Sequence, residues 1–349
     1  MQASEQHISI ILPVGPVTLQ NPSLARWLRA SIVSILAQTH RDFELLLILP
    51  NDICNSDSIL APIPQDSRIK YLNRDCPGIV SALNTGIAAA SGNWLARMDA
   101  DDLALPQRLS SQLSYMARNN DVDFCSGAVE IFSDDQPLAQ GNRQYQLWLN
   151  ETCSHDSISA NLYIECPCPH PTWLIKRKVI DTIGGYRNTQ WAEDYDFVLR
   201  AAQAGLRFGK PATDQGALLR WRTHPLNLTR KDSRYKKINF IKAKAWAMAQ
   251  SLLRDRPAVI VGTGNNAKHM YDALTNNNVQ VNYFVDLERP GRKTSLRNTP
   301  VISYSDIQKR HHRDALLVSV VTRYGARQQL RQWFDENKFI EQTHYVFAG

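Results

Sequence analysis

Strand-like and helix-like segments alternate over the first hundred residues, and this alternation limits the chain to a narrow group of folds. Apolar runs typical of buried strands and apolar residues at helical spacing follow one another, with strands expected at 7–14, 43–49, 69–72 and 94–98 and helices at 23–38 and 79–90. Parallel strands joined by helices form a sheet that is covered on both faces. We therefore expect an α/β fold with a mostly parallel central sheet.

The alternation starts again near the C-terminus. A strand-like run at 258–261 leads into a turn with Gly262, Gly264 and Ala267, and the next strand ends at Asp286. Such a turn lets a phosphate approach the backbone and a helix N-terminus, and the acid can bind ribose hydroxyls. The same turn occurs in domains without a nucleotide, so nucleotide binding, docking and homo-oligomerisation all stay open for this segment.

The two alternating regions predict two α/β domains with a helix between them. A chain of 349 residues that is 43% hydrophobic can bury more than one core. A long helix is expected over 233–254. We place the larger domain at 1–235, a helical linker at 236–254 and a smaller α/β domain at 255–349.

Cysteine spacing and hydropathy exclude several classes of protein. The six cysteines form no C-x-x-C pair, which argues against a zinc ribbon and a disulfide framework. No stretch reaches the roughly 18 to 20 apolar residues that span a bilayer, and residues 1–7 lack the basic start of a secretory signal. A cytoplasmic protein with reduced thiols is expected.

Most of the net charge of +7 comes from residues 220–244, where nine basic residues face one acid, Asp232. A solvated helix face, attraction to diphosphates and peripheral contact with the anionic inner face of a membrane are all compatible with this run. Nucleic-acid binding is disfavoured, because no recognised nucleic-acid motif accompanies the run and aromatic residues within it are sparse.

Three carboxylates, Asp99, Asp101 and Asp102, crowd together directly after the strand-like run 94–98. They repel one another unless they are solvated, hydrogen-bonded or neutralised by a cation. Ligands of open α/β sheets collect beyond the carboxyl ends of strands, and a divalent cation held there usually also binds substrate phosphates. This segment alone fits a cation site and an acidic turn capping the helix near Pro106 equally well.

Five motifs in a fixed order resolve part of this ambiguity. They are Ile11-Leu12-Pro13-Val14, residues 34–45, Ala82-Leu83-Asn84-Thr85-Gly86-Ile87, Asp99-Ala100-Asp101-Asp102 and Trp191-Ala192-Glu193-Asp194-Tyr195-Asp196. Together they resemble the family 2 glycosyltransferases of the GT-A fold, over roughly residues 7–235. The smaller domain resembles Rossmann-like modules appended to some bacterial glycosyltransferases.

The resemblance implies a nucleotide-sugar donor and a divalent cation, Mn²⁺ or Mg²⁺, that offsets the charge of the leaving diphosphate. It implies metal binding by Asp99, Asp101 and His224, and donor binding by Pro13, Val14, Asp52, Asn84, Asp99 and Asp102. An ordinary structural role for His224, and a capping role for Asp102, stay equally open.

The resemblance also implies a general base in the pair Glu193-Asp194, because an acceptor hydroxyl must lose its proton as it attacks. We assign the base to Asp194 and a supporting or acceptor-binding role to Glu193, with a swap of roles left open. Acids in the first turn of a helix also suit its dipole, so capping is a second interpretation.

One departure from the family pattern concerns the nucleotide. Family members commonly carry two acids after the second strand, where this chain has Leu49 and Pro50. UDP is the default donor nucleotide, and Asp52 is a candidate substitute for the missing acids.

The expected function is metal-dependent, inverting transfer of a sugar to a glycan or lipid-linked saccharide during surface polysaccharide synthesis. A sugar-phosphate nucleotidyltransferase is the alternative enzyme. Such enzymes favour a glycine-rich basic loop after the first strand, and residues 13–17 have neither those glycines nor a cation.

Overall fold

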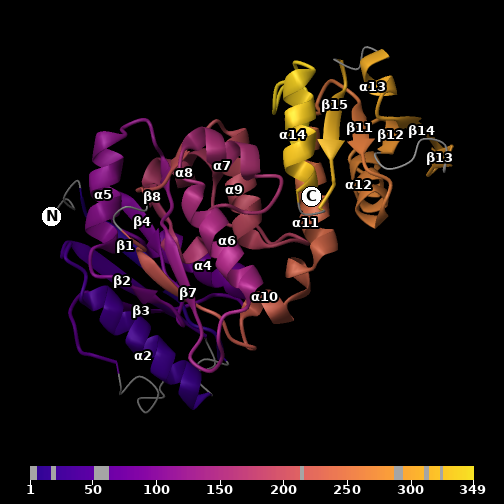
Figure 1. The fold of residues 1–349 in the computed structure, drawn as a ribbon. Helices are drawn as coiled ribbons and strands as arrows, with labels where there is room; N and C mark the ends of the chain where they lie inside the picture. Colours follow the sequence, from indigo (N-terminus) through magenta and orange to yellow (C-terminus); the bar gives the residue numbers. More distant parts are fainter. Residues whose placement is uncertain are drawn as a thin grey trace. The chain divides into compact units, whose positions relative to one another are not determined.

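The computed structural model describes seven stretches of the chain, which are residues 6–16, 21–50, 63–212, 216–286, 294–309, 314–322 and 325–349. They form two compact units (Figure 1). The first unit comprises Met1–Ile158, Pro167–Asn188 and Ala204–Lys231, and the second comprises Ser159–Cys166, Thr189–Gln203 and Asp232–Gly349. The division into a larger domain at 1–235, a linker at 236–254 and a smaller domain at 255–349 stays a prediction.

A seven-stranded sheet forms the centre of the first unit, in the order β3-β2-β1-β4-β8-β6-β9. Its strands are β1 (Ile8–Pro13), β2 (Phe43–Leu49), β3 (Ile69–Asn73), β4 (Trp94–Arg97), β6 (Phe124–Cys125), β8 (Leu174–Lys176) and β9 (Phe208–Gly209). Strands β1 to β4 are parallel, and β8 runs antiparallel to both β4 and β6. The predicted mostly parallel sheet is confirmed.

A smaller sheet in the first unit has the order β5-β10-β7. Its strands are β5 (Leu103–Ala104), β7 (Val129–Phe132) and β10 (Leu219–Arg222). Apart from α9 (Glu193–Gln203), the described helices up to residue 231 are α2 (Pro22–Leu36), α4 (Ile79–Ala89), α5 (Arg108–Arg118), α6 (Gln140–Glu151), α7 (His155–Asn161), α8 (Arg177–Ile183) and α10 (Leu228–Lys231), with a 3₁₀ turn at His170–Thr172. Strand β5 follows the acidic turn directly and pairs with β10.

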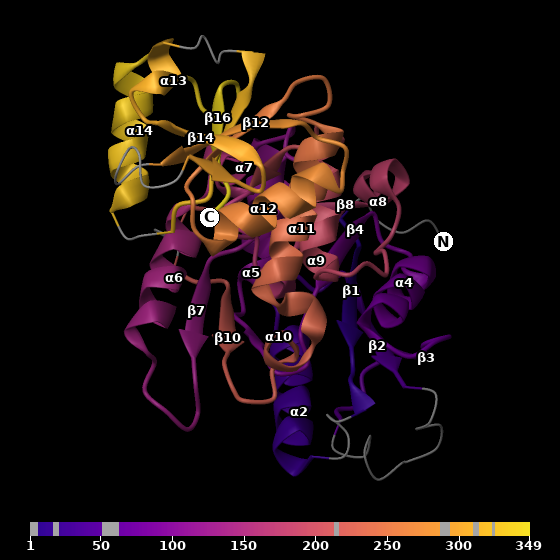
Figure 2. The same cartoon turned by 90° about the vertical axis from the view of Figure 1, so that its right-hand side faces the viewer.

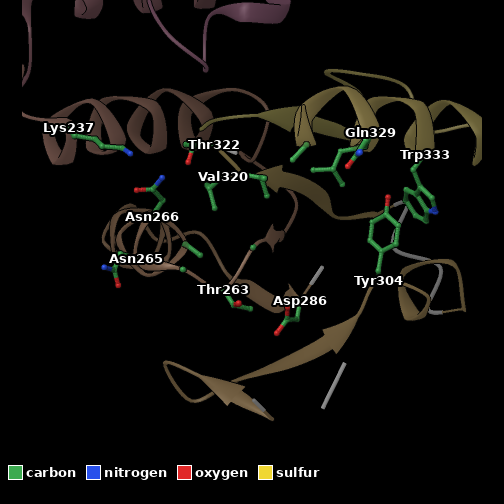
Figure 3. Close-up of a pocket in the computed structure, with 16 residues that line it drawn as sticks. Lys237, Thr263, Asn265, Asn266, Asp286, Tyr304, Val320, Thr322, Gln329 and Trp333 are labelled. Carbon is green, nitrogen blue, oxygen red and sulfur yellow. The ribbon is translucent and has the colours of Figure 1, made fainter. Parts of the chain in front are cut away.

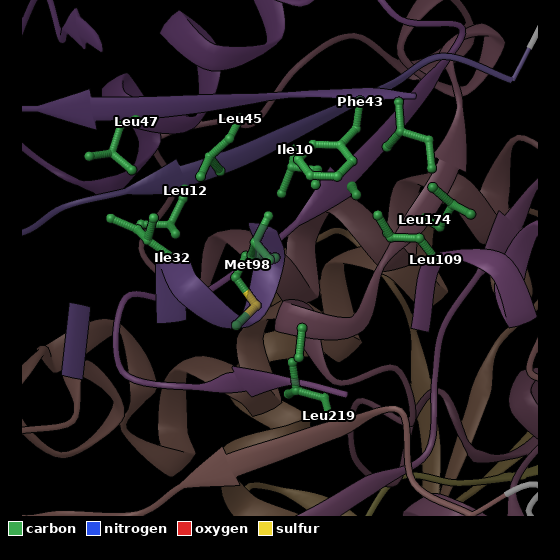
Figure 4. Packing of buried hydrophobic residues seen from close by; sticks show 14 of the residues in the cluster. Ile10, Leu12, Ile32, Phe43, Leu45, Leu47, Met98, Leu109, Leu174 and Leu219 are labelled. Carbon is green, nitrogen blue, oxygen red and sulfur yellow. The ribbon is translucent and has the colours of Figure 1, made fainter. Parts of the chain in front are cut away.

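Apolar side chains of β1 and β2 pack with α2 in the core of the first unit (Figure 4). Ile10, Leu12 and Ile32 are completely buried there. Met98, the residue before Asp99, lies in the same cluster and is also fully buried. Because burial of one such side chain is worth about 2 kcal/mol, the core fixes where the acidic turn begins.

The second unit has its own six-stranded sheet, in the order β13-β14-β12-β11-β15-β16. The strands are β11 (Ala258–Val261), β12 (Val281–Asp286), β13 (Ser295–Leu296), β14 (Thr299–Ser303), β15 (Leu316–Ser319) and β16 (Tyr345–Phe347). All neighbouring pairs are parallel except β13 with β14. Without β13, the order is the 3-2-1-4-5 arrangement of a Rossmann fold.

Helices cover both faces of this second sheet (Figure 2). Helices α11 (Lys237–Gln250) and α12 (Asn265–Thr275) pack on the face that contains Ile260. Helices α13 (Asp306–Lys309) and α14 (Ala326–Glu336) pack on the other face, which contains Val261. Helix α9 (Glu193–Gln203) belongs to the same unit and packs against α11 through Tyr195 and Leu199.

The predicted long helix over 233–254 is wrong in its bounds. A 3₁₀ turn at Ser233–Tyr235 comes first, and α11 covers 14 residues and ends at Gln250. The side chain of Asp232 accepts a hydrogen bond from the backbone N–H of Arg234 and caps the short turn, while Lys236 is extended. The extended backbone of Lys236, which ends the 3₁₀ turn and precedes α11, therefore separates two helical segments that share one apolar pattern.

Candidate functional site

The acidic turn Asp99–Asp102 lies at the carboxyl end of β4 and presents three carboxylates as one group. One oxygen from each of Asp99, Asp101 and Asp102 lies within 4.8 Å of the other two. The Ser31 hydroxyl on α2 donates a hydrogen bond to the backbone oxygen of Asp99 at 2.8 Å. The turn is thus held by the core on one side and by a helix on the other.

Asp102 is the buried member of the group, with no exposed surface. Its Oδ1 accepts a hydrogen bond from the backbone N–H of Arg222 at 2.7 Å, and its Oδ2 is buried without a hydrogen-bond partner among the described residues. Burial, and then the charges of Asp101 and Asp99, raise the pKa of Asp102 well above its usual range.

The capping interpretation of Asp102 is wrong. Helix α5 begins at Arg108, and its N-cap residue Gln107 makes no side-chain capping hydrogen bond. The Asp102 carboxylate instead holds β10, which is 120 residues away in the sequence. Its role is therefore tied to the strand that leads to His224.

The structure brings His224 and Asp101 together, although they are far apart in the sequence. The Nε2 atom of His224 lies 2.7 Å from Oδ2 of Asp101, and Asn227 Nδ2 donates to the same oxygen at 3.3 Å. The His224 ring packs against Trp27, with 4.7 Å between ring centroids. These contacts hold an imidazole at the edge of the acidic group, where the sequence predicted it.

Three arginines that the sequence analysis did not select surround the acidic turn. Arg97 binds Oδ1 of Asp99 at 2.5 Å, and buried Arg108 donates to the backbone oxygen of Arg97 at 2.7 Å. Arg222 donates from Nε to the backbone oxygen of Asp101 at 2.7 Å. Burial raises the pKa of Asp99 and the Arg97 charge opposes that rise. Arg97 stands two residues before Asp99, and Arg222 stands two residues before His224. This closeness in the sequence to a selected residue is the signal that could have identified these two arginines.

The acidic group fits a divalent cation. Its donors are carboxylate oxygens, the ligands that Mg²⁺ and Mn²⁺ prefer. The raised pKa values of Asp99 and Asp102, and the buried Asp102 oxygen without a hydrogen-bond partner among the described residues, are the features that a bound cation would compensate.

The predicted pair Glu193-Asp194 opens helix α9 in the second unit, and its two carboxylates differ in environment. Glu193 is 1% exposed and accepts a hydrogen bond from the Tyr235 hydroxyl at 3.0 Å. Arg234 lies 3.3 Å from its other oxygen. Asp194 is only partly buried and accepts a hydrogen bond from its neighbour's backbone N–H at 2.7 Å. Asp194 therefore keeps surface that Glu193 lacks.

The residues predicted to bind the donor are placed in different ways. Pro13 ends β1 and Val14 follows it, and both residues are buried, with the Val14 N–H donating to the backbone oxygen of Ile48 at 2.9 Å. Asn84 on α4 donates to the backbone oxygen of Tyr186 at 2.9 Å and accepts from its N–H at 2.8 Å. Asp52 lies outside the described residues. Donor contacts by these four residues stay predictions.

The basic run 220–244 is not one solvated face. Arg222 is buried against Asp134, and Arg234 pairs with Asp232 at 2.6 Å. Buried Lys244 donates to the backbone oxygen of Ile164 at 2.8 Å. Within the part of the chain that the structure describes, no helix is both long and apolar enough to cross a membrane.

The chain is similar in sequence to known glycosyltransferases. Residues 18–184 match the model of glycosyl transferase family 2. An uncharacterised glycosyltransferase of Methanocaldococcus jannaschii is 27% identical over 186 residues, which are 52% of this chain and 62% of that protein. The O-antigen biosynthesis glycosyltransferase WbnJ of Escherichia coli is 29% identical over 50% of this chain and 66% of its own length. The chain thus spans less than two thirds of these relatives.

Matches among solved structures include S. aureus TarS in complex with UDP-GlcNAc, with a TM-score of 0.49 and 12% identity over 78% of this chain and 71% of that chain. Another is the mannosyltransferase PcManGT of Pyrobaculum calidifontis in complex with GDP-Man and Mn²⁺. Its TM-score is 0.45, with 14% identity over 77% of this chain and 69% of that chain.

Proposed function

Because residues 18–184 place this chain in glycosyl transferase family 2, we propose that the protein transfers a sugar, with inversion, from a nucleotide-diphosphate sugar to a glycan or a lipid-linked saccharide. The observation that carries the proposal is the acidic turn Asp99–Asp102, with its crowded carboxylates and its histidine neighbour. UDP-sugars are the proposed donors, and surface polysaccharide synthesis is the proposed setting.

Asp99, Asp101 and Asp102, with His224 at their edge, would hold Mn²⁺ or Mg²⁺. When bound, the cation would stabilise negative charge on the departing diphosphate. The chain's own residues do the positioning. Arg97 orients the Asp99 carboxylate, and the Arg222 backbone N–H fixes one oxygen of Asp102 so that the other stays available.

Asp194 is the proposed general base. An acceptor hydroxyl has a pKa far above neutrality, so a carboxylate must take its proton as the oxygen attacks the anomeric carbon. Asp194 keeps accessible surface, whereas Glu193 is held by Tyr235 and Arg234. This difference supports Asp194 as the base and Glu193 as the residue that positions the start of α9.

We also propose a cytoplasmic location with access to lipid-linked acceptors at the inner face of the membrane. Although several cations of the basic run are buried, Arg230, Lys231 and Lys236 are exposed. Exposed basic side chains attract anionic headgroups by about 1 kcal/mol each near a membrane surface.

The decisive experiment measures release of nucleoside diphosphate by purified protein with Mn²⁺, an acceptor extract and a panel of UDP- and GDP-sugars. Asp194→Asn should lower kcat by about 10²- to 10⁴-fold and change donor affinity little, because it removes a proton acceptor. Asp181→Asn, an exposed acid on α8, is the matched control and should retain full activity.

Transfer at the original rate in Asp194→Asn would contradict the base assignment. Release of pyrophosphate from a nucleoside triphosphate and a sugar phosphate would instead favour the nucleotidyltransferase.

A further inference from the structure

The second unit contains a cavity of about 1140 Å³ that the proposed transfer reaction does not use (Figure 3). It is lined by the turn after β11, by Asp286 at the end of β12, by the segment after β15 and by α14. Strands β11 and β15 are the neighbours at which the strand order reverses. Open α/β sheets bind ligands in the crevice at this point.

The turn after β11 has the backbone of a phosphate cradle. Gly262 adopts a φ of +123°, which side chains rarely allow, and Gly264 is extended. A Cβ atom added at Gly264 would meet no atom within 4 Å, so space lies open in front of this backbone. Ala267 is completely buried and brings the helix close to the sheet. Small residues at these three positions serve close approach of a phosphate and close helix packing.

Helix α12 starts at this turn and covers 11 residues. Its N-cap, Gly264, makes no side-chain hydrogen bond to the first turn. The N–H of Ala267 donates to the backbone oxygen of Gly264 at 3.1 Å, whereas the N–H groups of Asn265 and Asn266 can bind an anion, which the helix dipole favours. Lys237 from α11 also lines the cavity and adds a positive charge near Asn266, as Figure 3 shows.

The rest of the cavity suits a nucleoside. Asp286 places a carboxylate at the end of the neighbouring strand, where ribose hydroxyls are bound in such folds. Tyr304, which follows β14, and Trp333 on α14 form an aromatic pair with 4.1 Å between ring centroids (Figure 3). Aromatic rings bind bases by stacking, which is worth about 1–3 kcal/mol per base.

A buried hydroxyl lies at the same strand ends, on a residue that is not among the described residues lining the cavity. Ser319 ends β15, is completely buried, and its Oγ has no hydrogen-bond partner among the described residues. It pairs in register with Val261, directly before the glycine turn, and precedes Val320 in the cavity lining. An unpaired buried hydroxyl is costly, so this strand end carries a polar group for which the described residues supply no partner.

We propose that this cavity is a second nucleotide-binding site, separate from the acidic turn. The phosphates lie on the turn 262–267 and the start of α12 beside Lys237, a ribose hydroxyl donates to Asp286, and the base lies against Tyr304 and Trp333. The cavity is large enough for a nucleotide with a further group attached, because ligand pockets usually measure about 300–1,000 Å³. Asp286 is the only carboxylate among the described residues that line the cavity. The phosphates would therefore be bound by backbone N–H groups and Lys237, and binding needs no divalent cation.

The test is calorimetric titration of the full chain in EDTA with ADP, UDP, GDP, NAD⁺ and UDP-glucose, each singly. At least one of them should bind, and Asp101→Asn, which damages the acidic turn, should bind it equally well. Gly264→Val should weaken binding at least tenfold without lowering Tm, because the new side chain enters open space. Asp286→Asn should weaken nucleotide binding but not binding of inorganic pyrophosphate. Asp335→Asn, an exposed acid on α14, is the control.

The proposal is overturned if none of the five nucleotides binds in EDTA, or if Gly264→Val binds them as well as the original protein does. Sugar transfer with Mn²⁺ is assayed separately on the same preparations. If sugar transfer occurs but no nucleotide binds in EDTA, the second nucleotide site is contradicted. If a nucleotide binds in EDTA but no sugar is transferred, the proposed transferase function is contradicted.

Discussion

The two units place polar groups at the same position in the fold, beyond the carboxyl ends of parallel strands, but with opposite chemistry. The first unit gathers three carboxylates there and surrounds them with arginines. The second unit has a glycine turn, an uncapped helix N-terminus and one carboxylate. The sheet topology thus determines where a ligand would lie, and the side chains determine how its phosphates would be bound.

Because of this difference, ligand binding at the two sites should depend on different properties of the protein. An acidic group binds a diphosphate only through a cation, so chelators and charge changes should act on it strongly. A turn that offers backbone N–H groups depends on space and backbone shape instead.

The largest expected effect is on the acidic turn. Asp101→Asn removes a charge that would hold the cation and an acceptor for His224, so kcat/KM for sugar transfer should fall by about 100- to 1000-fold. Asp135→Asn, an exposed neighbour of the ion pair at Asp134, should change it by less than about twofold. Nucleoside diphosphate release over a range of Mn²⁺ concentrations measures both variants. Full sugar-transfer activity in Asp101→Asn would show that the acidic turn does not depend on this charge, and would contradict the proposed difference between the two sites.

The free energy of unfolding should depend on pH through Lys244, a buried lysine on α11 in the second unit. Burial lowers the pKa of Lys244 to about 8, below its ordinary value of 10.5. The unfolded chain therefore binds more protons between these values, and this residue makes the free energy of unfolding rise as the pH increases from about 8 to 10.5. The gain is at most about 3 kcal/mol, at 1.36 kcal/mol per pKa unit.

Urea unfolding of the original protein and of Lys244→Met at several pH values measures this contribution. The variant should lack that part of the slope, whatever its stability at neutral pH. Equal slopes in the two proteins would show that Lys244 titrates normally.

A smaller effect should distinguish two arginines of β10. Arg222→Met removes a buried guanidinium that holds Asp134 and the backbone of Asp101, and should lower the free energy of unfolding by about 2 kcal/mol. Arg220→Met is the matched control on the same strand, because its ion pair with Glu130 is exposed and it should cost less than about 1 kcal/mol. Urea denaturation compares them, and equal losses would argue against a special role for Arg222 at the acidic turn.

The sequence predicted those parts of the molecule that depend on local patterns. Continuous apolar runs located β1, β2 and β11, and the spacing of Gly262, Gly264 and Ala267 located the start of α12. The cluster Asp99–Asp102 was visible because its members are neighbours in the chain. Each of these signals lies within a few residues.

What the sequence did not predict depends on contacts between distant segments. The ambiguity of Asp102 could be removed only by seeing its bond to Arg222, and Arg97 and Arg108 carry no motif. The different burial of Glu193 and Asp194 follows from Arg234 and Tyr235, about 40 residues later, which the sequence showed only as part of a basic run. Periodicity alone also joined two helical segments that the extended residue Lys236 separates.

The bond between Asp102 and Arg222 also bears on how the protein folds. It closes a loop of 120 residues, so Asp102 cannot gain this partner until most of the first unit has been synthesised. Contacts of such long range form slowly, because the entropy of closing the loop must be overcome first. On a ribosome that adds about 5–20 residues per second, β4 and its carboxylates emerge several seconds before their strand partner. The acidic turn therefore matures late in biosynthesis, well after the strand that carries it.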